Sequence, residues 1–94
     1  MTENLSVANE LPPSDETRIY CRDHYIIPAR TRGQKEVTIR SGDVHHELNF
    51  TNRLPLVCGA LGSTKFENMA RVKRKSIDGP TNGANTKFTF YILW

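Results

Sequence analysis

The chain has 94 residues, of which 37% are hydrophobic and 24% are charged, and its formal net charge at pH 7 is +3. This length suits one small domain, and the composition lies within the globular range. No apolar run approaches the roughly 18 residues of a membrane-spanning helix, and the N-terminus lacks the pattern of a secretory signal. We therefore expect a cytoplasmic protein without a membrane partner, whose two cysteines, Cys21 and Cys58, are reduced.

The charge is divided unevenly along the chain. Residues 1–16 contain four acidic residues and no lysine or arginine, whereas residues 17–94 carry all 13 basic residues against six acidic ones, which is +7. Residues 1–14 also lack a periodic apolar pattern, so we expect a flexible acidic leader there and one domain over residues 15–94. A basic domain of this size most often binds a polyanion, and nucleic acid is the first candidate. The alternative is that the basic side chains are simply solvated and bind no partner.

The first helical pattern covers residues 15–32. Its apolar side chains form a broad face: Ile19, Tyr20, Tyr25, Ile26 and Ile27. Pro28 cannot donate to the carbonyl four residues earlier, so we expect a kinked helix that ends at Gly33. Residues 36–40 alternate and are rich in β-branched side chains, which predicts a short strand.

Two short helices are expected next. Residues 42–48 predict the first, and residues 52–62 predict the second after a three-residue break. Pro55 falls in the first turn of the second helix, where a proline is tolerated. The inward stripe of this helix has the spacing i, i+3, i+4 and i+7: Leu54, Val57, Cys58 and Leu61. Its small residues are expected on the outward face: Gly59 and Ala60.

The last third of the chain predicts a hairpin. Strands over residues 70–77 and 86–94 flank a loop rich in Gly, Pro and Asn at residues 78–85. The second strand alternates, with three side chains facing inward: Phe88, Phe90 and Ile92. Val72 and Ile77 are the candidate inward residues of the first strand, and their opposite parity predicts a bulge between them.

This order of elements resembles the winged helix-turn-helix fold, an α+β fold in which three helices pack against a small three-stranded antiparallel sheet. The resemblance covers residues 15–94, and its specific part is residues 41–63, a capped helix, a tight turn and a second helix with aliphatic side chains inward. The chain also resembles a group of small prokaryotic domains that share the pattern TIRSGDVHHEL…NRLPLVCGAL…F…GP…GANT.F.F. We can attach no biochemical activity to that group.

The winged-helix resemblance implies double-stranded DNA binding, as in transcription regulators, with helix 52–62 as the recognition helix in the major groove. The residues at and around this helix that would contact bases or phosphates are Thr51, Asn52, Arg53, Leu56, Ser63, Thr64 and Lys65. Basic residues elsewhere would contact the phosphate backbone: Arg40, Lys73 and Lys75. The loop at residues 78–85 holds no basic residue, which leaves its contact with DNA open. A winged-helix module that binds only protein, through Leu56, Tyr91 and Trp94, is the alternative.

The sequence offers no enzyme, metal or cofactor site. His45 and His46 are adjacent, so on a helix their side chains point about 100° apart and do not easily share one ion. Cys58 lies on the predicted buried stripe, where a thiol is unreactive, and the loop DGPTNGAN lacks the lysine and the following helix of a phosphate-binding loop. These patterns specify neither the oligomeric state nor a DNA sequence.

Overall fold

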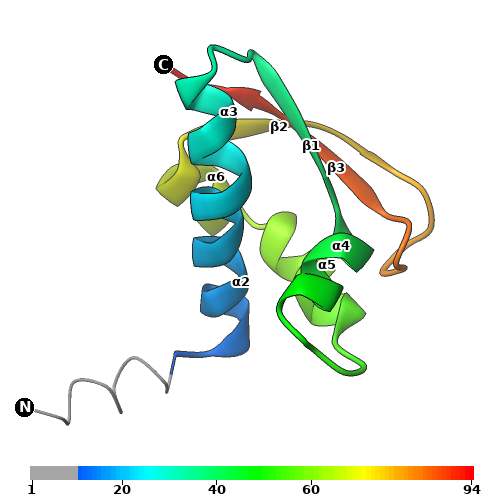
Figure 1. The fold of residues 1–94 in the computed structure, drawn as a ribbon. Coiled ribbons are helices and arrows are strands. Elements are labelled where there is room, and N and C mark those ends of the chain that lie inside the picture. The colour runs from blue at the N-terminus through cyan, green and yellow to red at the C-terminus, as the bar shows by residue number, and fades with distance from the viewer. Residues whose placement is uncertain (1–10) are drawn as a thin grey trace, which may run out of the picture.

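One long helix, three short helices and a three-stranded antiparallel sheet make up this α+β fold (Figure 1). The structure is a computed structural model that describes residues 11–94, so most of the expected acidic leader lies outside the described residues. None of the helices in the described part is long and apolar enough to cross a membrane. The elements in chain order are α2 (Pro13–Cys21), η1 (Arg22–Ile26), α3 (Ile27–Thr31), β1 (Glu36–Arg40), α4 (Ser41–Glu47), α5 (Leu54–Leu61), α6 (Thr64–Ala70), β2 (Val72–Asp78) and β3 (Lys87–Ile92).

The first helix is continuous from α2 through η1 to α3 and begins two residues before the expected start at residue 15. The irregularity expected at Pro28 is present as η1, a π-helical turn in which the Ile27 N–H donates to the carbonyl of Arg22. The wider turn accommodates a residue that has no N–H to donate. Gly33, at φ +75°, follows the last turn as expected.

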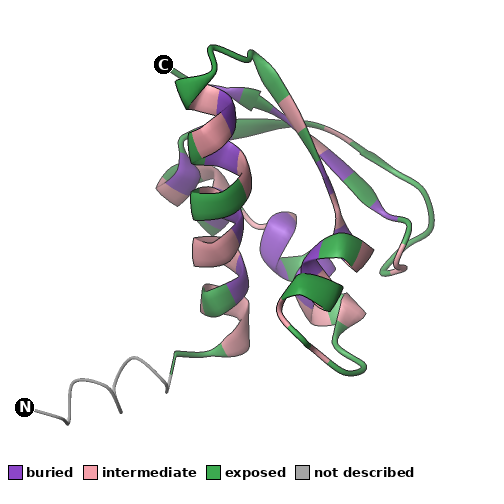
Figure 2. Cartoon of the chain, in the orientation of Figure 1, coloured by how far each residue is buried: buried purple, intermediate pink, exposed green. Residues whose placement is uncertain are grey.

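The sheet has the strand order β1-β3-β2, and both neighbouring pairs are antiparallel. β1 has the predicted bounds, and Ile39 on β1 lies opposite Phe88 on β3. The predicted bulge in β2 is present between Arg74 and Ser76. The predicted inward residues of β3 are all buried: Phe88, Phe90 and Ile92. Within residues 11–94 no helix covers the other face of the sheet, and Figure 2 shows β2 and the loop after it as largely exposed.

The helix α5 confirms part of its expected pattern and corrects the rest. Pro55 lies in its first turn, and three residues of the predicted stripe are buried: Val57, Cys58 and Leu61. Leu54 is only half-buried. Ala60 was expected outward but is 2% exposed, because α5 packs against α2 on one side and α4 on the other and so buries a wider face than one stripe.

The helix α6 was not predicted, and residues 70–71 therefore do not belong to β2. Ser63 caps α6 by accepting a hydrogen bond from the N–H of Phe66 at 3.2 Å. Phe66 is fully buried and meets Phe90 of the sheet edge to face, with 5.2 Å between ring centroids. Arg71, at φ 59°, ends the helix in the left-handed region. The contact between the two rings joins α6 to the sheet in one core.

Candidate nucleic-acid interface

The structure distributes the ten residues expected to contact DNA over three surface regions. The first is the turn between α4 and α5 with the first turn of α5: Thr51, Asn52, Arg53 and Leu56. The second is the α5–α6 junction: Ser63, Thr64 and Lys65. The third is the sheet: Arg40 at the end of β1, with Lys73 and Lys75 on β2.

The turn between α4 and α5 projects three consecutive exposed residues: Thr51, Asn52 and Arg53. The Arg53 N–H donates to Nε2 of His45 at 3.1 Å, so His45 holds the start of α5 in place. The Arg53 guanidinium lies 5.7 Å from the centroid of the Phe50 ring and pairs with no carboxylate in residues 11–94. Its charge is therefore available to an anion at this turn.

The outward surface of α5 is small and uncharged. Pro55 and Gly59 are its exposed residues, and Leu56 is half-buried. A Cβ added at Gly59 would meet no atom within 4 Å, so nothing in the described part of the chain covers that position. Because α5 has no long polar side chain on this surface, the exposed polar side chains lie in the preceding turn rather than along the helix.

At the α5–α6 junction, the polar groups are already used within the chain. The Ser63 hydroxyl donates to the carbonyl of Ala60 at 2.7 Å and accepts from Nε of Arg18 at 3.1 Å, in addition to capping α6. Lys65 donates to Asp15 at 2.9 Å, and this hydrogen bond is the main cause that lowers the pKa of Asp15. Ser63 and Lys65 thus join the junction to the first helix.

On the sheet, intramolecular pairs hold two of the three expected basic residues. Arg40 donates to Asp43 at 2.7 Å and to Asn85 at 2.7 and 3.1 Å. Lys75 donates to Glu36 at 2.9 Å, which raises the pKa of Lys75, and its ammonium lies 5.5 Å from the Tyr91 ring centroid. Lys73 is exposed and forms no ion pair within residues 11–94.

The loop between β2 and β3, residues 79–86, is bound to the start of α4, which the sequence did not predict. The fully buried Ser41 donates its hydroxyl to the Gly83 carbonyl and its N–H to the Thr86 carbonyl at 2.9 Å. The Gly42 N–H donates to the Ala84 carbonyl at 2.9 Å, and a Cβ on Gly42 would lie 2.6 Å from the same oxygen. The loop is therefore held against the helical pair.

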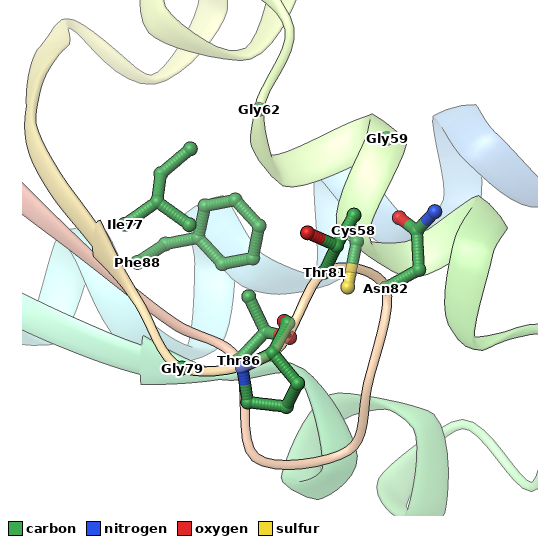
Figure 3. A pocket seen from close by; sticks show the side chains of 10 residues that line it. Cys58, Gly59, Gly62, Ile77, Gly79, Thr81, Asn82, Thr86 and Phe88 are labelled. Atoms are coloured by element: carbon green, nitrogen blue, oxygen red, sulfur yellow. Dashed lines mark hydrogen bonds between the residues drawn. The ribbon is translucent and has the colours of Figure 1, made fainter.

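A pocket of about 330 Å³ lies between α5 and this loop (Figure 3). Its lining comes from α5 and its end (Cys58, Gly59 and Gly62), from the two strands (Ile77 and Phe88) and from the loop (residues 79–82 and Thr86). Ile77, expected to be an inward residue, is 50% exposed because it forms a wall of this pocket. Arg74 is not a lining residue, but its guanidinium donates to the carbonyl of Gly62, which lines the pocket, at 2.8 Å.

Sequence reasoning missed the pocket and the role of Arg74. The signals were the glycines at positions 59 and 62, on the α5 side of the pocket, and at position 79, on the loop side. Comparison with known proteins gave no match to any protein-family model, curated protein or solved structure. Geometry and charge are therefore the grounds for a functional assignment.

Proposed function

We propose that this domain binds double-stranded DNA as a winged-helix module. In this proposal α4, the turn at residues 48–53 and α5 are the helix-turn-helix unit, and the hairpin of β2 and β3 is the wing. The observation that carries the proposal is the turn itself, which presents exposed Thr51, Asn52 and Arg53 between the two helices. The element order and the strand order β1-β3-β2 fit the same architecture, and α6, inserted between α5 and β2, is an addition to it.

The unpaired basic residues support a polyanionic ligand. Eight of the 13 basic residues form no ion pair within residues 11–94: Arg30, Arg32, Lys35, Arg53, Arg71, Lys73, Arg74 and Lys87. Arg30 is committed elsewhere, since its guanidinium donates to the carbonyls of Ala70 and Arg71 at 2.9 and 3.0 Å. Arg74 donates one N–H to the Gly62 carbonyl and keeps its other donors. Together with the remaining six residues it can neutralise phosphates, with a salt dependence that grows with each phosphate contacted.

The chemistry of α5 supports binding with little sequence preference. Phosphate contacts fix the position of a protein on the duplex, whereas base-edge contacts carry the sequence information. Asn52 and Arg53 are the side chains suited to base edges, and α5 beyond them presents Pro55 and Gly59. We therefore expect affinity to come mainly from the backbone of the duplex.

Amide shift mapping with a duplex of random sequence tests this function. We expect the largest shifts at residues 51–56 and a loss of affinity of several-fold in Arg53→Ala. Arg22→Ala is the matched control, because Arg22 is a surface arginine of the first helix that already pairs with Asp23 at 2.9 Å. Equal affinities of the two variants, or an absence of shifts at the turn in a folded sample, would refute the proposed interface.

A protein-interaction module is the second candidate, and exposed apolar residues at the end of the chain favour it. Tyr91 is 43% exposed, Leu93 is 45% exposed and Trp94 is 66% exposed. Large exposed apolar side chains that gather in one place mark interaction surfaces. A ligand at these residues would bind with little salt dependence and would shift the amides at the end of β3 rather than those of the turn.

A further inference from the structure

The pocket between α5 and the β2–β3 loop has preformed walls. The Thr86 hydroxyl donates to the Pro80 carbonyl and accepts from the Gly83 N–H at 3.0 Å, which fixes the curvature of the loop. Gly79, at φ +97°, has no room for a side chain, because a Cβ there would lie 2.5 Å from the Asn85 carbonyl oxygen. Together with the hydrogen bonds from the start of α4, these contacts hold the loop side of the pocket in shape without a ligand.

The lining has a mixed polarity without charge. The apolar residues of the lining are Ile77, Pro80, Phe88 and Cys58, and its polar side chains are Thr81, Asn82 and Thr86, whose hydroxyl is used within the loop. Figure 3 shows the Thr81 and Asn82 side chains extending from the β2–β3 loop. Neither side chain makes a hydrogen bond within residues 11–94, so the Asn82 amide offers a free donor and a free acceptor.

The lining selects a class of occupant. A phosphate or a carboxylate would be poorly solvated there, because no lysine or arginine side chain lines the space. A purely aliphatic side chain would leave the Asn82 amide without a partner. A flat neutral heterocycle with hydrogen-bonding edges satisfies both surfaces, since its face packs on Ile77, which is 50% exposed, and its edge meets the amide.

Positive charge stands near the α5 side of the pocket. The guanidinium of Arg74 donates to the carbonyl of Gly62, a lining residue, whereas Arg40 pairs with Asp43. Arg74 has no carboxylate partner within residues 11–94. The arrangement is complementary to a neutral ring joined to phosphates.

We propose that this pocket takes one unstacked nucleobase of the bound DNA. The proposal rests on the proposed function and gives the module a preference for duplexes that contain an unpaired base, which costs least to unstack. The base lies between Ile77 on one side and Gly59 and Gly62, in α5 and at its end, on the other. Asn82 contacts its edge, and Arg74 contacts a neighbouring phosphate.

Fluorescence anisotropy with three duplexes of identical flanks tests this preference. The first duplex is fully paired, the second carries one unpaired adenine, and the third carries an abasic residue in place of that adenine, so that it has the same backbone without the base. We expect the unpaired adenine to increase affinity about tenfold over the abasic duplex, the scale of stacking one base on a protein. Equal affinities for these two duplexes would overturn the proposal.

Gly59 gives a matched pair of variants. Gly59→Leu adds an apolar side chain at a lining position where a Cβ meets no atom within 4 Å, and both it and Gly59→Ala favour the helix over glycine. We expect Gly59→Leu to abolish the tenfold difference while circular dichroism remains that of the wild type, and Gly59→Ala to retain most of it. Discrimination that survives in Gly59→Leu would place the base elsewhere and contradict the proposal.

Two further readouts separate the possible failures. If the paired duplex binds and the adenine adds nothing, the base pocket fails and the proposed function stands; if no duplex binds, both fail. N-acetyl-leucinamide is the probe for an apolar protein side chain. Shifts of the Gly59, Gly62 and Gly79 amides with this probe, and none with the unpaired adenine, would overturn the nucleobase assignment.

Discussion

The contact between Gly42 and the β2–β3 loop gives a prediction with a defined magnitude. Gly42 lies in the first turn of α4, and a Cβ there would be 2.6 Å from the Ala84 carbonyl oxygen and 3.1 Å from the Ala84 Cβ. Ordinary contacts begin near 3.4 Å, so the loop has to retreat by roughly 0.8 Å in Gly42→Ala. That shift weakens the hydrogen bonds that hold the loop to α4.

The expected cost follows from those bonds. The loop is held by the Gly42 N–H and by the N–H and hydroxyl of Ser41, and each such hydrogen bond contributes about 0.5–1.5 kcal/mol. Losing two of them costs about 2 kcal/mol, and the helix preference of alanine over glycine returns at most about 1 kcal/mol. We expect Gly42→Ala to lower the free energy of unfolding by about 1–2 kcal/mol, a decrease in Tm of roughly 5–12 °C for a domain of this size.

Thermal and urea unfolding followed by circular dichroism measure this difference. Gly59→Ala is the control, because the same substitution in α5 meets open space and is expected to raise stability by up to about 1 kcal/mol. If Gly42→Ala proves as stable as the wild type, the loop is not bound to α4 as described. The claim that the loop forms a preformed wall of the pocket would then be contradicted.

Two further predictions concern the helices. Burial of Tyr25 and, second, its hydrogen bond to Glu47 raise the pKa of Tyr25 above the usual value near 10. The neutral hydroxyl therefore stabilises the fold below pH 10, and this stabilisation should be lost as the pH rises through the raised pKa. Urea titrations at pH 8–11 should show a smaller loss in Tyr25→Phe, and an identical slope would contradict this cause. Ser63→Ala should cost about 1–2 kcal/mol because it removes the cap of α6 and the acceptor for Arg18, whereas exposed Thr64→Ala should cost less than about 0.5 kcal/mol.

The elements that could be predicted are those whose pattern depends only on residues close together in the sequence. The alternation in residues 36–40 gave the bounds of β1, and the parity of Val72 and Ile77 gave the bulge in β2. The helix α6 was missed because Ser63 and Thr64 were interpreted as phosphate contacts, although Ser63 is a preferred N-cap residue and Glu67 is an acidic residue in the first turn. The sequence around Ser63 and Thr64 fits either phosphate contacts or the start of a helix, and only the tertiary contact of Phe66 distinguishes the two.

The burial of Ala60 and the exposure of Ile77 depend on how elements pack. Ala60 is covered because α5 contacts two helices, and the second contact has no signature within residues 52–62. Ile77 follows the bulge in β2 and faces the pocket rather than the core. The attachment of the β2–β3 loop to α4 joins residues more than 40 positions apart, so the pocket could not be derived from spacing along the chain.

The salt dependence of duplex binding tests the central claim most directly. The measurement is the affinity of the folded domain for a 16-base-pair random duplex at 50–200 mM salt, for the wild type and Arg53→Ala. With three phosphates neutralised, we expect affinity to fall about 40-fold over this range, with a slope reduced by about one in the variant. An absence of binding at every salt concentration would contradict DNA binding through the turn between α4 and α5. So would an affinity that changes neither with salt concentration nor with Arg53→Ala.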